Sequence, residues 1–264
     1  MSPILIYKQF SLSPLETIIA YKQSAVGEVN HKMCYAGRLD PMAEGVLVVL
    51  AGEDCKDRKM YEDLPKTYEF EIIPGITTDT YDIMGMFTHQ LTIDTANRSN
   101  DISQYMSSLI GKQKQPYPPF SSARVQGKPL YYWARAGKID TIQVPHKEIE
   151  IYKAEMVGVR KISTQGLLEL IIKRVSDTKG KFRQDEILDQ WKSVLKDINA
   201  ELLAYKCRVV CSSGTYIRSI AHEIGQKLGI GAIALGIKRI AVGTYKLEDC
   251  IQITDSGTVT THEA

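Results

Sequence analysis

The feature that most constrains this chain is a sharp turn that leads directly into a buried strand. Asp40 lies in the turn between Gly37 and Pro41, and the Val- and Leu-rich run 46–50 follows Gly45. Such a run is typical of a strand that is covered by the rest of the protein. Because Pro41 disfavours helical backbone at the residue before it, Asp40 is expected on an extended loop. On local chemistry alone, Asp40 is either a turn residue bonded to its own backbone, which is the commoner case, or a reactive group.

The composition is that of an ordinary globular protein. The 264 residues are 44% hydrophobic and 24% charged, which allows one large domain or two small ones with a sizeable core. The formal net charge is only +2, so no global basic field indicates a nucleic-acid partner. An RNA-binding surface would have to come from local clusters, and composition leaves a neutral metabolic enzyme open.

Cysteine usage and the absence of long apolar runs predict a cytoplasmic protein. The five cysteines are an odd number with no secretory segment before them, which favours reduced thiols. They form no Cys-x-x-Cys pair, and no histidine lies at ligand spacing, so we expect no metal site. No apolar run reaches the length of a membrane span.

Hydrophobic periodicity predicts a mixture of strands and helices. Strands are expected over 3–8, 66–73, 148–159, 166–175, 205–211 and 237–245. Helices are expected after Ser13, over 53–61 and 102–110, within 187–198, and after the Ser212-Ser213-Gly214 segment. The proline-rich span 112–120 should be extended and fits poorly in the middle of a sheet. Residues 254–264 are polar and expected to fray.

Two side chains stand out within these elements. Tyr68 alternates with Phe70 and Ile72 on one face of its strand, where a half-buried aromatic is the commonest interpretation. Arg218 lies close to a helix N-terminus, where the helix dipole disfavours a cation. We therefore expect Arg218 to have an anionic partner, although a simple surface arginine is the other interpretation.

The segment 121–138 mixes basic and aromatic side chains, Arg124 and Lys128 among them. This combination can hold phosphates and stack on bases, which is what splayed-out RNA requires. A solvated loop followed by an ordinary amphipathic helix is the alternative, and we favour RNA contact.

Four segments in order resemble one family. The stretch 37–47 resembles the G-x-L-D-P-x-A-x-G-x-L signature of the TruB family of tRNA pseudouridine synthases. The segments 66–68, 119–137 and 213–218 resemble further motifs of the same family, so the resemblance covers most of the chain. It implies an α+β pseudouridine synthase fold, in which helices flank a mixed, mainly antiparallel sheet that carries RNA-binding insertions.

The resemblance also implies an activity and roles for particular residues. It implies base flipping and isomerisation of uridine-55 in the T-loop, with the tRNA T-arm as partner and neither metal nor cofactor. The catalytic residues would be Asp40, Tyr68 and Arg218, with Asp40 ionised, Arg218 paired to it and Tyr68 against the flipped uracil. The substrate-binding residues would be Tyr35, Lys66, Tyr216, Arg124 and Lys128.

The chain departs from the family pattern in three places. Tyr35 stands where the family usually has a histidine, and it can stack but cannot carry the charge of that histidine. The usual K-P-x-G motif is absent after Lys8. Residues 176–203 are inserted before the last motif and begin with a basic cluster, which either adds a contact to tRNA or is a solvated hairpin tip.

We therefore expect a monomer with one catalytic domain over residues 1–250, insertions at about 112–145 and 176–203, and a polar tail over 251–264. We expect no PUA domain, which many family members carry after the catalytic body, because the sequence ends too soon for one. Two alternatives stay open. One is an RNA-binding or tRNA-folding protein whose catalysis is dispensable. The other is a guide-dependent, dyskerin-like enzyme, which the missing PUA segment disfavours.

Overall fold

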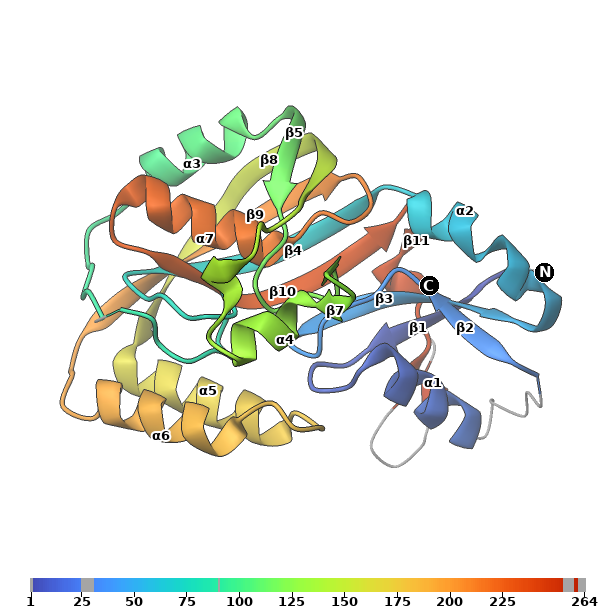
Figure 1. Ribbon diagram of the computed structural model, residues 1–264, viewed down its shortest axis with the longest axis horizontal. Helices are drawn as coiled ribbons and strands as arrows, with labels where there is room; N and C mark the ends of the chain where they lie inside the picture. Colours follow the sequence, from blue (N-terminus) through green and yellow to red (C-terminus); the bar gives the residue numbers. More distant parts are fainter. Residues whose placement is uncertain (1, 25–30, 90, 254–258, 261–264) are drawn as a thin grey trace.

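A single mixed sheet forms the centre of the computed structural model, which describes residues 2–24, 31–89, 91–253 and 259–260 (Figure 1). Within these residues the sheet has nine strands, in the order β1-β3-β10-β4-β9-β8-β5, with β2 and β11 added beside β3 and β10. The strands are β1 (Ile4–Lys8), β2 (Met33–Ala36), β3 (Ala43–Ala51), β4 (Lys66–Pro74), β5 (Gly111–Pro116), β8 (His146–Ser163), β9 (Glu201–Cys211), β10 (Ala232–Val242) and β11 (Tyr245–Lys246). In this described part of the chain only β3 and β10 pair in parallel, which confirms the mixed, mainly antiparallel sheet.

The strand after the Asp40 turn is β3, and its run 46–50 is fully buried as expected. Gly45 lies inside this strand with a φ of 111°, and a Cβ there would be 2.2 Å from the carbonyl oxygen of Arg239. No side chain fits at that position, so Gly45 allows β3 and β10 to approach each other. The turn that carries Asp40 is thereby held close to β10, the neighbour of β3 in the sheet.

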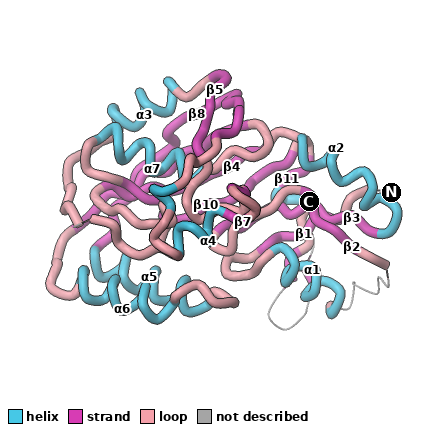
Figure 2. Tube along the Cα trace, viewed as in Figure 1, coloured by secondary structure: helices cyan, strands magenta, loops and turns pink. Residues whose placement is uncertain are grey.

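Most helices begin where capping and periodicity predict. Helix α1 (Pro14–Gln23) starts with a capping box between Ser13 and Glu16. The predicted helix 53–61 is a 3₁₀-helix, η1 (Gly52–Asp57), followed by α2 (Arg58–Asp63). Helices α3 (Ser99–Ser108) and α7 (Ile217–Leu228) lie together against the sheet, and Figure 2 shows the strands as a central layer with helices around it.

The strand predicted over 166–175 is wrong, because this segment belongs to helix α5 (Thr164–Asp177). Ser163 caps the helix by accepting a hydrogen bond from the amide of Gly166, and the apolar residues buried along it are Leu167, Ile171 and Val175. These three are spaced by four, which is the period of a helix.

On one side, β8 pairs with β9, and Ser163 lies opposite Glu201 at the end of that pairing. The segment between these two strands, 164–200, therefore carries helices α5 and α6 (Gln184–Leu195). Its second helix joins the main core through Ile187, Trp191 and Leu195.

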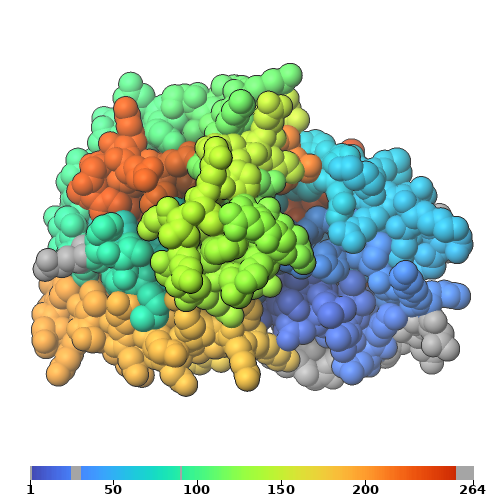
Figure 3. Space-filling view, viewed as in Figure 1, coloured from blue at the N-terminus to red at the C-terminus, as the bar shows by residue number. Residues whose placement is uncertain are grey.

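The segment 112–145 leaves the sheet at its edge strand. β5 is the outermost strand beside β8, which explains how it accommodates Pro116. The short strands β6 (Arg124–Val125) and β7 (Lys128–Pro129) follow, then helix α4 (Leu130–Arg135) and η2 (Ile139–Thr141). Figure 3 shows this segment, in green, on the face turned to the viewer, between the blue N-terminal part and the α5–α6 hairpin.

The C-terminal segment returns to the first strand. After η3 (Leu247–Asp249), the amide of Ile251 donates to Leu5 at 2.8 Å, and the amide of Tyr7 donates to Ile251 at 2.8 Å. β12 (Gln252–Ile253) then pairs with β13 (Val259–Thr260). Residues 254–258 and 261–264 of the tail that we expected to fray lie outside the described residues. Within the described part, no helix is long and apolar enough to cross a membrane.

Candidate active site

Arg218 and Asp40 meet although they lie far apart in the sequence. The Arg218 side chain is 5% exposed in the first turn of α7, and its Nε and Nη2 each lie 2.8 Å from Oδ2 of Asp40. Its Nη1 donates to the carbonyl of Thr80 at 2.7 Å, and Nη2 donates to the carbonyl of Phe120 at 3.3 Å. The anionic partner predicted for Arg218 is confirmed, and the guanidinium is held from three sides.

A second carboxylate faces the same guanidinium. Oδ2 of Asp82 lies 3.5 Å from Nε of Arg218, and Oδ1 accepts hydrogen bonds from the hydroxyl of Thr80 and the amide of Met84. Burial raises the pKa of Asp82 to about 6, although Arg218 acts in the opposite direction. For Arg218 itself, burial disfavours the charge, but the charges of Asp40 and Asp82 outweigh this and raise its pKa.

Sequence reasoning missed Asp82, which lies in the segment 75–82, where the Thr and Asp residues are also suited to tight turns. A signal was present, since Asp82 directly precedes the apolar pair Ile83-Met84. A carboxylate next to a buried run requires a cation or several donors, and Arg218 supplies the cation.

Asp40 borders a cavity of about 290 Å³. Its side chain is 35% exposed, so the carboxylate is reachable from this space. The cavity is lined by Lys66, Tyr68, Tyr216, Ile237, Arg218 and Arg239, together with the turn around Asp40. The predicted catalytic residues Asp40, Tyr68 and Arg218 therefore border one space.

Tyr68 lies on β4 and is almost completely buried. Burial raises the pKa of its phenol, although the nearby Arg239 acts to lower it. Arg239 is directly opposite Tyr68 in the pairing of β10 with β4.

Arg239 lines the cavity and is also hydrogen-bonded to the turn that carries Asp40. Its side chain is fully buried, with Nε donating to the carbonyl of Val46 at 2.8 Å and Nη2 donating to the carbonyl of Gly37 at 3.2 Å. Sequence reasoning missed this residue, although a cation within the apolar strand 237–245 was a usable signal.

Two buried lysines support the backbone around the cavity. Lys66 donates to the carbonyls of Glu62 and Leu64, and burial, followed by the charge of Arg239, lowers its pKa to about 8. Lys8 is fully buried beneath the Asp40 turn, where it donates to the carbonyls of Pro41 and Ala43. Burial lowers the pKa of Lys8 to about 7. Both lysines therefore hold the main chain in place by donating hydrogen bonds to its carbonyls.

A second cavity, of about 600 Å³, also reaches Asp40 and Arg218. Its aromatic and basic lining residues are Tyr35, Arg38, Phe120, Tyr131, Arg135, Phe182, Arg183 and Tyr216. Tyr35 therefore lies on a different side of Asp40 from Tyr68. Tyr216 borders both cavities, and Gln115 holds its backbone through hydrogen bonds of 2.8 and 3.1 Å.

Two predicted binding residues lie apart from both cavities. Arg124 and Lys128 are exposed on the β6–β7 hairpin. Arg124 donates to the carbonyl of Gly127 at 2.8 Å, and Lys128 lies 4.1 Å from the ring centre of Tyr132. Among the described residues, no group of three or more His, Cys, Asp or Glu side chains could hold a metal ion.

Residues 25–181 match the family model described as TruB family pseudouridylate synthase (N terminal domain). The chain belongs to the TruB family of pseudouridylate synthases. It is similar to proteins named tRNA pseudouridine synthase B, with 31% identity over 237 residues in Thermosipho melanesiensis, covering 88% of this chain and 63% of that relative. The identity is 32% over 209 residues in Nitratidesulfovibrio vulgaris, covering 79% and 54%. The chain thus spans less than two thirds of the length of the curated relatives it matches.

The fold is shared with two solved structures. One is titled "Crystal Structure of a Cbf5-Nop10-Gar1 Complex", with a TM-score of 0.58, 18% identity, and coverage of 97% of this chain and 53% of that chain. The other is titled "Structure of H/ACA RNP bound to a substrate RNA containing 2'-deoxyuridine", with a TM-score of 0.54, 17% identity, and coverage of 97% and 52%. At this identity the similarity shows the fold, and it confirms the predicted α+β pseudouridine synthase class.

Proposed function

We propose that this chain is a tRNA pseudouridine synthase that isomerises uridine-55 of the T-loop. The observation that carries the proposal is the Asp40–Arg218 pair, with contacts of 2.8 Å, at the border of a cavity that Tyr68 also lines. Membership of the TruB family and the names of its relatives support tRNA as the substrate.

The reaction requires an ionised carboxylate beside the flipped base. The bond between N1 of uracil and C1′ of the ribose breaks, a bond between C5 and C1′ forms, and the hydrogen at C5 is replaced by one at N1. Whether Asp40 attacks the base or the sugar, it acts as a carboxylate. Both contacts with Arg218 use Oδ2, so Oδ1 is the oxygen available to react.

Tyr68 is placed to lie against the uracil. Because burial raises the pKa of its phenol, Tyr68 is protonated at neutral pH and does not serve as a base there. We assign it a stacking role, while Lys66 supports the wall of the cavity. The target base must leave its stack to reach this space.

Two further sets of residues would bind the part of the RNA that stays outside the cavity. Tyr35 and Tyr216 border the second cavity and present aromatic faces beside Asp40. Arg124 and Lys128 present exposed charges on the β6–β7 hairpin, where they would hold the T-arm backbone. A catalytic unit over residues 1–250 that acts as a cytoplasmic monomer completes the proposal.

The test is a pseudouridine map of T-arm RNA after incubation with wild-type protein, with Asp40→Asn and with Asp197→Asn as the control. Asp197 is exposed beyond α6, so its variant matches the chemical change away from both cavities. We expect wild type and control to modify the RNA and Asp40→Asn to leave it unmodified. Tight binding without modification by any variant would indicate an RNA-binding protein instead. Modification only after addition of a guide RNA would indicate the guide-dependent class.

A further inference from the structure

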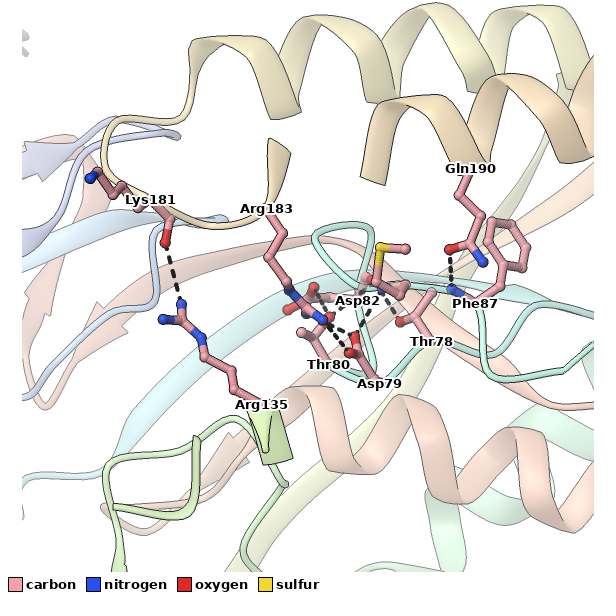
Figure 4. A network of polar contacts seen from close by, with 10 residues as sticks. Thr78, Asp79, Thr80, Asp82, Phe87, Arg135, Lys181, Arg183 and Gln190 are labelled. Atoms are coloured by element: carbon pink, nitrogen blue, oxygen red, sulfur yellow. Dashed lines mark hydrogen bonds and ion pairs between the residues drawn. The ribbon is translucent and has the colours of Figure 1, made fainter. Parts of the chain in front are cut away.

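The loop between α5 and α6 sends one arginine back into the body of the protein. The backbone of Arg183 is left-handed, with a φ of 64°, and its guanidinium forms a double hydrogen bond with Asp79 (Figure 4). Nη1 lies 2.8 Å from Oδ2 of Asp79, and Nη2 lies 3.2 Å from Oδ1. Such a bidentate pair fixes the orientation of both groups, unlike a single contact from a lysine.

Asp79 belongs to the tight loop that holds Arg218. The next residue, Thr80, offers its carbonyl to Nη1 of Arg218 at 2.7 Å. The loop has little freedom to adjust, because a Cβ at Gly85 would lie 2.4 Å from the hydroxyl of Thr80 and 2.8 Å from Oδ1 of Asp79. A shift at Asp79 therefore also moves the acceptor of Arg218.

Arg183 also contacts the second backbone segment that holds Arg218. The carbon at the centre of its guanidinium lies 4.8 Å from the ring centre of Phe120. The carbonyl of Phe120 accepts a hydrogen bond from Nη2 of Arg218 at 3.3 Å. One guanidinium thus touches both segments whose carbonyls orient Arg218.

We propose that Arg183 is a positioning residue, through which the α5–α6 hairpin fixes Arg218 and, through it, Asp40. The proposal rests on the proposed function only for its activity measurement. It gives Arg183 a role inside the protein rather than in the contact with tRNA that the basic cluster could add, because the charge of Arg183 is paired with Asp79. It also gives a reason for a non-glycine residue in left-handed backbone, since such strain is tolerated where surrounding contacts require it.

The first test measures the order of Arg218 by NMR, independently of catalysis. The Nε–H resonance of Arg218 is assigned by its disappearance in Arg218→Lys. We expect a sharp resonance in wild type and in the control Lys192→Gln, whose charge is exposed on α6. In Arg183→Gln the resonance should shift and broaden, and Arg183→Lys should restore it only in part, because lysine cannot form the bidentate pair.

The second test separates rate from binding in single-turnover kinetics. We expect Arg183→Gln to slow pseudouridine formation about tenfold while the Kd for T-arm RNA stays within about twofold. Asp79→Asn should have the same effect, and the double variant should be no slower than either single one. Urea unfolding checks that each variant is folded.

Two outcomes would overturn the inference. An unchanged Arg218 resonance in folded Arg183→Gln, or a weakened Kd with an unchanged rate, would show that Arg183 does not position Arg218. A wild-type protein that forms no pseudouridine would instead refute the proposed function, and the NMR comparison would still decide the role of Arg183.

Discussion

One cation between two carboxylates dominates the site at the scale of single residues. Arg218 is buried, and burying a guanidinium is costly unless it is paired and hydrogen-bonded. Asp40 and Asp82 supply the charge, and two backbone carbonyls accept the remaining donors. Asp40 lies 2.8 Å and Asp82 3.5 Å from Arg218, and Asp82 is deeply buried whereas Asp40 is partly open, so the two acids differ toward a substrate.

The raised pKa of Asp82 predicts an acid limb in the activity. Below about pH 6 Asp82 becomes protonated, and Arg218 then has only one anionic partner instead of two. We expect kcat to fall through this range in wild type. In Asp82→Asn, kcat should be lower than in wild type and should stay constant between about pH 5 and about pH 7. A limb near pH 6 that persists in Asp82→Asn would assign the titration to another group.

The same group should affect stability in the opposite direction. The folded pKa of Asp82, about 6, lies above its ordinary value of 3.8, so the folded protein binds more protons within this window. The contribution of Asp82 to the free energy of unfolding therefore falls as pH rises from 3.8 to about 6. Urea unfolding of wild type and Asp82→Asn across this window measures the difference.

At the scale of helices and strands, the sequence predicts an element correctly where that element depends on contacts between neighbouring residues. The cap at Ser13 and the apolar stripe of α7 are properties of a few neighbouring residues, and both helices form as predicted. The segment 166–175 was misassigned because a short apolar run fits a strand or a buried helix equally well. The next strand in the chain that pairs with β8 is β9, which lies beyond a further helix in the sequence.

The same distinction explains which site residues were found. Asp40, Tyr68 and Arg218 lie in recognisable motifs, and the structure brings them to one cavity. Lys8 and Arg239 act by donating to backbone carbonyls of strands and turns far away in the sequence. Their importance depends on burial that only the folded arrangement creates, and for Arg239 the local signal was only a cation within an apolar strand.

The two tryptophans test whether the α5–α6 hairpin is part of the core. Trp191 is fully buried and the centre of its ring lies 4.5 Å from that of Phe87, whereas Trp133 is partly exposed on α4. We expect Trp191→Ala to cost about 3–5 kcal/mol of unfolding free energy. The matched Trp133→Ala should cost about 1 kcal/mol or less. Equal decreases in urea unfolding would contradict an integral role for the hairpin.

At the scale of the whole molecule, the position of charge matters more than its sum. The formal net charge is +2, and the two carboxylates that face Arg218 offset its positive charge at the centre of the site. Exposed basic side chains are present on the 112–145 segment, Arg124 and Lys128 among them, and Figure 3 shows this segment on one face of the protein. The proposed function thus assigns the attraction of RNA and the chemistry on the base to different parts of the surface.

This separation predicts a salt-dependent weakening of RNA binding when the hairpin charges are removed. In the double variant Arg124→Gln with Lys128→Gln, Kd for T-arm RNA should rise and KM should change more than kcat. The slope of log Kd against log salt should fall by about 1 for each phosphate that is no longer neutralised. Lys192→Gln, which removes a charge from the outside of α6, serves as the control. Because neither Arg124 nor Lys128 lines a cavity at Asp40, a slope equal to that of wild type would place the RNA backbone elsewhere on the protein.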